Sequence, residues 1–301
     1  MIEMVEYGGW GECLRLSNGL IELVAPTEVG PRVIRLGFVG GRNLFREYPE
    51  QLGRTGDAEW RIYGGHRLWH APEDFPRTYS PDNVPIGQHW DGRTLTLRGE
   101  DQPNGLGKEL RLTLDPGAAR VEVAHRLINR GAWAVELAPW ALSVMAPGGR
   151  AIVPQEEFRP HPEALAPVRP VVLWSYTDMS DPRWSWGRRY VQLRQDPSAT
   201  SKQKAGFLNT RGWAAYLLDG EVLLKRYPCL PAAVYPDMGC NTQIFTDPEM
   251  LELETLGPLT RLEPGAHVEH VERWYLARVD CGPSDEELDE ALVPLVAATG
   301  A

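Results

Sequence analysis

Apolar and polar residues alternate over short segments through most of this chain. Leu110, Leu112 and Leu114, for example, occupy every second position of residues 107–115. Successive side chains of a β-strand point to opposite faces, so this alternation predicts strands with one buried face. Further strand-like segments cover residues 20–26, 32–38, 94–100, 120–129, 135–145, 214–228, 242–247 and 250–276. Gly, Pro, Asn and Asp separate these segments, which is typical of an all-β antiparallel sandwich or barrel.

Two local patterns are more specific. Residues 214–228 predict a hairpin that turns over Asp219 and Gly220. Helical periodicity is convincing only after Ser284, which can cap a helix with Glu287 three residues later as a capping box. Pro294 is expected to end or kink this helix. No repeat and no charged linker divides the chain, so residues 1–301 are interpreted as a single domain.

The charge and the cysteines narrow the class of protein. A formal net charge of -10 predicts neither nucleic acid nor an anionic membrane surface as a partner. The four cysteines form no CxxC pair, which favours free thiols in a reducing compartment. The chain begins without a signal-peptide pattern and contains no apolar run of membrane-spanning length. We therefore expect a cytoplasmic protein.

Two glutamates occupy alternate positions of residues 250–256. Glu252 and Glu254 share one strand face, whereas Leu251 and Leu253 share the other. Such a pair belongs either to a surface strand with its polar side in water or to a polar concave face. The local pattern leaves both interpretations open.

Residues 59–76 contain the densest group of polar and aromatic side chains. His66 and His70 follow a Gly-Gly pair, which argues against a helix; on a strand they would lie on one side. Neither has a carboxylate or thiol at ligand spacing nearby, so no metal site is predicted. Motifs for a nucleophilic serine, a phosphate loop and a zinc protease are all missing from the sequence. The group is expected to form a ligand site in which Arg61, Arg67 and Trp69 take part.

The sequence Leu253-Glu254-Thr255 is followed by Leu262-Glu263-Pro264-Gly265 and a closing strand at 270–276. In this ordered series of motifs the chain resembles the aldose 1-epimerase (galactose mutarotase-like) superfamily. Residues 30–45 and 121–142 are similar to its early strand pair and its central strands. Residues 61–73 are similar to a glycine-pair segment of its hexose-6-phosphate epimerase branch.

The resemblance implies a large antiparallel supersandwich whose concave face binds a small carbohydrate. It implies Glu254 as catalytic base and Glu252 as its neighbour, with no metal or organic cofactor. A carboxylate and an imidazole would suit mutarotation, because burial can tune both towards neutral pH. Trp69 or Trp140 would stack on the sugar, and Arg61 would hold one of its polar groups.

One position departs from the family pattern. Trp140 lies where the family supplies a histidine as general acid, and an indole cannot donate that proton. Either His66 or His70 is then the acid, or the chain binds sugar without catalysis, or it is another carbohydrate enzyme such as a lyase or hydrolase. A replacement acid opposite Glu254 would distinguish an enzyme from a binding protein. The identity of the sugar and the oligomeric state are beyond the sequence.

Overall fold

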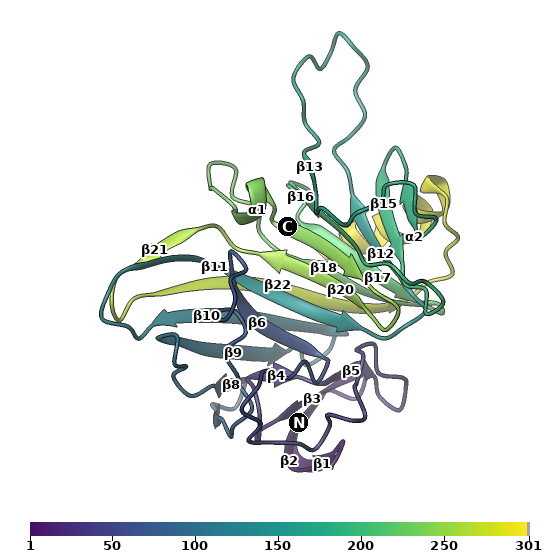
Figure 1. Cartoon of the computed structure of the whole chain (residues 1–301). Helices are drawn as coiled ribbons and strands as arrows, with labels where there is room; N and C mark the ends of the chain where they lie inside the picture. Colours follow the sequence, from purple (N-terminus) through teal and green to yellow (C-terminus); the bar gives the residue numbers. More distant parts are fainter. Residues whose placement is uncertain (300–301) are drawn as a thin grey trace.

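Antiparallel strands in three sheets make up most of the regular secondary structure (Figure 1). The structure is a computed structural model, and it describes residues 1–299. The predicted antiparallel β-sandwich is confirmed. The interpretation of the chain as one domain stays a prediction.

The N-terminal residues form a small sheet of four strands at one end of the molecule (Figure 1). In order across this sheet, the strands are β1 (Ile2–Tyr7), β2 (Trp10–Ser17), β3 (Ile21–Pro26) and β5 (Arg35–Phe38). Its apolar side chains, such as Leu16 and Leu23, join the main core. The small sheet is therefore packed into the same hydrophobic interior as the sandwich.

Two large sheets form the sandwich itself. The ten-stranded sheet has the order β14 (Trp184–Trp186), β15 (Tyr190–Arg194), β12 (Arg150–Pro154), β17 (Trp213–Leu218), β18 (Glu221–Arg226), β22 (His267–Arg278), β10 (Arg120–Asn129), β9 (Leu106–Leu114), β8 (Thr94–Arg98) and β7 (Gly87–Trp90). The eight-stranded sheet has the order β13 (Val171–Leu173), β16 (Gln203–Phe207), β19 (Thr242–Thr246), β20 (Leu251–Leu256), β11 (Val135–Met145), β6 (His66–Ala71) and β4 (Arg32–Val33), and β21 (Thr260–Leu262) pairs with the start of β11.

The core lies where the inner faces of these two sheets meet. Leu110 and Leu112 of β9 are fully buried there, as their alternation predicted, together with Leu251 and Leu253 of β20. Because neighbouring side chains of β20 alternate, burying these two leucines in the core turns Glu252 and Glu254 towards the outer face of the eight-stranded sheet.

The turn and helix predictions can be compared directly. β17 and β18 form the predicted hairpin, and Asp219 and Gly220 both adopt positive φ at its turn. Helix α2 (Asp285–Ala298) begins at the predicted capping box of Ser284 and Glu287. The expectation that Pro294 ends the helix is wrong, since α2 continues to Ala298. Leu288 and Leu292 hold α2 against the outer face of the ten-stranded sheet.

The remaining short helix, α1 (Pro236–Gly239), is a single turn. The loop between β12 and β13 projects away from the body (Figure 1). All four cysteines are free, and among the described residues no helix is both long and apolar enough to cross a membrane.

Candidate functional site

The outer face of the eight-stranded sheet carries rows of functional side chains. Residues directly opposite one another in antiparallel strands point to the same face. Arg67 of β6 lies opposite Leu142 of β11, and Leu142 lies opposite Glu254 of β20. In a neighbouring row, Trp69 lies opposite Trp140. The strand register therefore brings side chains that are almost 190 positions apart in the chain onto one surface.

A third row lies on the other side of Glu254. Glu252 of β20 is opposite Phe245 of β19, and Phe245 is opposite Lys204 of β16. Lys204 extends back across this face until its Nζ lies 3.2 Å from Oε2 of Glu254. The sheet thus places a buried cation beside the proposed base.

These rows surround a cavity of about 340 Å³, which is within the range of small-molecule sites. Five of the residues predicted from the sequence bear on it. Arg67, Trp69, Trp140 and Glu252 line it, and Glu254 contacts two of its wall residues. The other lining residues are Trp60, Ile62, Glu73, Tyr79, Leu142, Tyr176, Lys202, Lys204, Phe245, Asp247 and Met250.

Glu254 lies behind this wall and is fully buried. Its Oε2 accepts hydrogen bonds from Nε1 of Trp140 at 2.8 Å and from Nζ of Lys204 at 3.2 Å. Its Oε1 has no hydrogen-bond partner among the described residues. Burial raises the pKa of Glu254 to about 7, although Lys204 lowers it and Glu252 adds a further upward contribution. A carboxyl group with such a pKa can exchange a proton near neutral pH.

Glu252 is paired rather than solvated. It is 7% exposed, and its Oε1 accepts a hydrogen bond from Nη2 of Arg67 at 2.9 Å. The Arg67 guanidinium also lies over the ring of Trp69, 4.5 Å from its centroid. Of the two interpretations of this glutamate pair, the surface strand is therefore wrong, and both carboxylates belong to a buried polar layer.

Two glycines set the starting point of β6. Gly64 and Gly65 adopt φ values of +98° and +71°, which strongly favour glycine. A Cβ at Gly64 would lie 2.0 Å from the carbonyl oxygen of Arg46, and one at Gly65 would lie 2.2 Å from that of Val33. The chain can pass this close to the backbone of Arg46 and Val33 only if residues 64 and 65 have no side chain. This close approach fixes which residues of β6 face the cavity.

The two histidines lie on the opposite face of β6, so the expectation that they share the pocket with Glu254 is wrong. A strand places His66, Leu68 and His70 on one side, as predicted, but this side faces the core. Neither histidine lines the cavity. His70 is 1% exposed, its ring nitrogens have no partner among the described residues, and burial lowers its pKa to about 3. A neutral, enclosed imidazole cannot donate a proton to a ligand in the cavity.

His66 belongs to a hydrogen-bonded cluster in the core. Its Nδ1 lies 2.8 Å from Oγ of Ser143, and its Nε2 lies 2.6 Å from Nε2 of His125. His125 places its Nδ1 2.9 Å from the carbonyl oxygen of His270. Since that carbonyl can only accept, Nδ1 of His125 carries a proton, and Nε2 of His66 donates to Nε2 of His125. Burial lowers the pKa of both His66 and His125, which keeps these rings neutral.

The same cluster contains a glutamate from β22. Glu272 Oε1 accepts hydrogen bonds from Lys225 Nζ at 3.0 Å and from Thr255 Oγ1 at 2.6 Å. Its Oε2 accepts one from Trp274 Nε1 at 2.6 Å. Burial alone would raise the pKa of Glu272, but Lys225 and the neighbouring donors lower it to about 2.

The geometry revises one expectation about metals. His66 was predicted to lack a carboxylate partner, yet ligand atoms of His66, His125 and Glu272 all lie within 4.8 Å of one another. The sequence hides this group because its members come from three separate strands. Each of these atoms is, however, engaged in or close to the hydrogen bonds described above. The cluster therefore has a structural explanation that requires no metal.

Arg61 lies outside the cavity wall. Its Nε is 3.2 Å from Oδ2 of Asp57, and it does not line the cavity. Sequence reasoning also missed Lys204, Trp60 and Tyr79, which do line it. A lysine among the otherwise uncharged residues 203–207 was the available signal for Lys204, but its partner Glu254 is identified only by the register of β16, β19 and β20.

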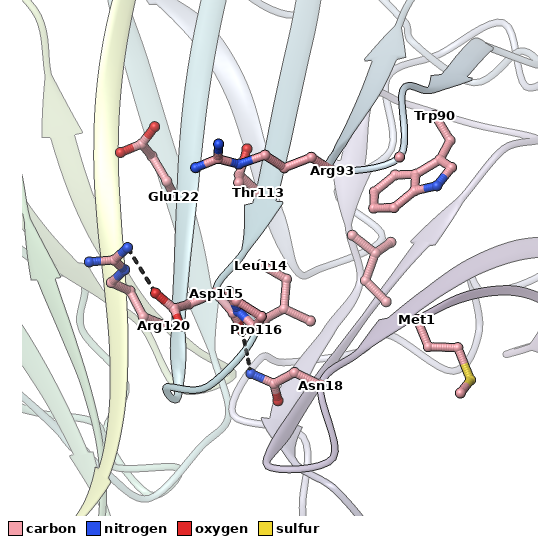
Figure 2. A pocket seen from close by; sticks show the side chains of 12 residues that line it. Met1, Asn18, Trp90, Arg93, Thr113, Leu114, Asp115, Pro116, Arg120 and Glu122 are labelled. Carbon is pink, nitrogen blue, oxygen red and sulfur yellow. Dashed lines mark hydrogen bonds and ion pairs between the residues drawn. The ribbon is translucent and has the colours of Figure 1, made fainter.

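A second hollow of about 360 Å³ lies between the N-terminal sheet and the ten-stranded sheet (Figure 2). Several of its polar side chains already have protein partners. Arg120 Nη2 lies 2.9 Å from Asp115 Oδ2, and Asn18 Nδ2 donates to the carbonyl oxygens of Asp115 and Ala118. Since no buried polar atom is left unpaired in its wall, we place the candidate site at the Glu254 cavity instead.

Comparison with known proteins supports the fold. No family model and no curated protein matches the chain. The chain is similar to a structure from Klebsiella pneumoniae provisionally described as an aldose 1-epimerase, with a TM-score of 0.60 at 11% identity over 92% of this chain and 83% of that one. It is also similar to a galactose mutarotase related enzyme from Lactobacillus acidophilus, with a TM-score of 0.52 at 9% identity over 89% and 99% of the two chains.

A third similar structure is a TPR-domain containing protein from Parabacteroides distasonis, with a TM-score of 0.58 at 14% identity. The match covers 89% of this chain but 48% of that protein, so this chain spans about half of its length. At these identities the likeness concerns the fold. The chain has the galactose mutarotase-like β-sandwich fold.

Proposed function

We propose that this protein is an aldose 1-epimerase-like isomerase, which interconverts the anomers of a sugar bound in the Glu254 cavity. One observation carries the proposal. Glu254 is a buried carboxyl group with a pKa of about 7 and one unpaired oxygen, and a lysine ammonium contacts its other oxygen. An acid and a base are thus adjacent at the wall of a sugar-sized cavity.

The reaction needs a base for the anomeric hydroxyl and an acid for the ring oxygen. Ionised Glu254 takes the proton from the hydroxyl on C1, while the Lys204 ammonium gives a proton to the ring oxygen. The bond between C1 and the ring oxygen breaks, and an open-chain aldehyde forms. Rotation about C1–C2 followed by the reverse proton transfers closes the ring as the other anomer. Positioned acid–base groups of this kind contribute roughly 10²–10⁴-fold to the rate.

Lys204 takes the role that the sequence assigned to a histidine. It lines the cavity, which neither His66 nor His70 does. Its ammonium lies 4.8 Å from the ring centroids of both Trp140 and Trp174. The proposed reaction requires Lys204, which lines the cavity and contacts Glu254, to move so that the ligand reaches this carboxylate.

Aromatic and cationic groups position the sugar. The indoles of Trp69 and Trp140 meet edge to face with centroids 5.5 Å apart, and both line the cavity. Their faces suit the C–H surface of a pyranose. The guanidinium of Arg67 and the carboxylate of Glu252 offer donors and acceptors for sugar hydroxyls at the same wall.

Binding without catalysis is the second candidate, and one observation favours it. Glu254 is 0% exposed and already holds two hydrogen bonds on Oε2, as a purely structural carboxylate would. The two functions differ in a simple observable, since only an enzyme accelerates the exchange of anomers.

The test is an NMR or polarimetric measurement of anomer exchange with common aldoses, their 6-phosphates and uronic acids. Glu254→Gln should lower turnover by roughly 10²-fold or more while sugar affinity survives. Glu252→Gln should cost less, and Glu263→Gln, a change of an exposed residue, should cost nothing. Acceleration of exchange that is equal in wild type and Glu254→Gln would refute the proposed role. Affinity for a sugar without any acceleration of anomer exchange would support the second candidate, a sugar-binding protein.

A further inference from the structure

A larger cavity adjoins the Glu254 cavity. It has a volume of about 770 Å³, and its wall is formed by the segments 58–60, 75–81 and 103–104. Trp60 and Tyr79 line both cavities, so the two spaces meet at these rings. The loop after β6 also contributes to both, through Glu73 on one side and Phe75 on the other.

A continuous series of aromatic rings connects the two spaces. Trp140, which donates to Glu254, contacts Trp69 at a centroid distance of 5.5 Å. Trp69 contacts both Trp60 and Tyr79, at 5.0 and 4.9 Å. Tyr79 then contacts Phe75 at 5.6 Å. Each step leads away from the proposed base and towards the larger cavity.

Phe75 ends this series in the solvent. Its side chain is 80% exposed although it lies on the wall of a cavity. Burying an apolar ring of this kind on a ligand is favourable, and a pyranose presents C–H groups that suit an aromatic face. The larger cavity therefore has the composition of a subsite for a further sugar ring.

We infer that the substrate is a reducing disaccharide or longer oligosaccharide whose second ring lies against Trp60, Tyr79 and Phe75. This inference rests on the proposed function, and the chemistry of that function fixes the orientation. Ring opening needs a free anomeric hydroxyl, so the reducing-end sugar occupies the Glu254 cavity. The second sugar must be attached through another hydroxyl and extend into the larger cavity.

The inference is tested by calorimetric binding of D-glucose against cellobiose, maltose and lactose, and of D-galactose against 1,4-galactobiose. Each pair shares the same reducing-end sugar. Wild-type protein should bind at least one disaccharide roughly tenfold more tightly than its monosaccharide. Phe75→Ala should abolish this difference while leaving monosaccharide affinity unchanged, because Phe75 lines the larger cavity and does not line the Glu254 cavity. Phe75 is so exposed that its replacement does not threaten folding.

Trp133→Ala is the matched control, because Trp133 is 84% exposed and lines neither cavity. It should retain the full preference for the disaccharide. Equal affinity for both members of every pair, or a preference that survives in Phe75→Ala, would overturn the subsite alone if monosaccharide anomers still exchange. Absence of both binding and exchange for every sugar would overturn the proposed function together with the subsite.

Discussion

Glu254 and Glu272 lie on opposite sides of the eight-stranded sheet, Glu254 on its outer face and Glu272 in the core, and their surroundings are alike in kind. Each is fully buried, and each accepts hydrogen bonds from an indole and from a lysine ammonium. Their pKa values nevertheless differ in direction, since that of Glu254 rises to about 7 and that of Glu272 falls to about 2.

The difference lies in the number of donors and in the neighbouring charge. Oε1 of Glu272 accepts from both Lys225 and Thr255, and its Oε2 accepts from Trp274, so both of its oxygens are satisfied. Glu254 keeps one oxygen without a partner among the described residues, and Glu252 lies nearby as a like charge. Burial raises both pKa values, and at Glu272 it is outweighed by the Lys225 charge, with further lowering from His125, His270 and the Thr255 hydrogen bond. A carboxylate that is incompletely solvated by the protein is the one available for proton transfer.

The largest expected effect concerns the satisfied carboxylate. Glu272→Gln leaves Lys225 as a buried charge without its counter-ion, so unfolding free energy should fall by about 3–5 kcal/mol. Urea denaturation measures this change. Glu263→Gln, an exposed control, should stay within about 0.5 kcal/mol of wild type. A loss of unfolding free energy below about 1 kcal/mol for Glu272→Gln would contradict the structural role of this carboxylate.

The unsatisfied carboxylate should make stability depend on pH. The folded-state pKa of Glu254, about 7, is above its ordinary value of 4.5, so its contribution to stability is complete below about pH 4.5. That contribution is lost as the pH rises through about 7, by roughly 3 kcal/mol in all. Denaturation of wild type and Glu254→Gln at several pH values isolates this group. A difference between the two proteins that does not change with pH would contradict the raised pKa.

Lys204 should affect both the rate of anomer exchange and the pKa of Glu254. Lys204→Met should lower anomer exchange roughly 10–100-fold, because the acid is removed. The exchange rate should increase with pH as Glu254 loses its proton. In Lys204→Met this increase should occur at higher pH, since Lys204 lowers the pKa of Glu254. Lys202 is exposed and lines the same cavity. Lys202→Met should lower the exchange rate less and should not change the pH at which the rate increases. Wild-type rates and pH dependence in Lys204→Met would refute its role as the acid.

The smallest effect is expected at Arg61. Its half-buried side chain pairs with Asp57 away from the cavity, and such ion pairs contribute little. Arg61→Ala should keep anomer exchange within about twofold of wild type, and stability should change by about 0.5 kcal/mol. A tenfold loss of sugar affinity in Arg61→Ala would instead support the sugar-binding role predicted for Arg61 from the sequence.

Alternation within single strands was sufficient to predict the sandwich and the shared face of Glu252 and Glu254, because both follow from local geometry. It also placed His66 and His70 on one side of a strand. It could not say which side faces the core, since that depends on β6 pairing with β11. Lys204 was missed for the same reason, because the register of separate strands brings it to Glu254.

The hydrogen bond from Trp140 to Glu254 makes this indole a reporter of the base. When Glu254 loses its proton, a full negative charge appears 2.8 Å from the indole nitrogen, and the fluorescence of Trp140 responds to that field. The comparable indole of Trp274 reports nothing over the same range, because Glu272 stays ionised well below neutral pH. The emission difference between wild type and Trp140→Phe therefore follows the titration of one carboxyl group, even before any sugar that the protein accepts is known.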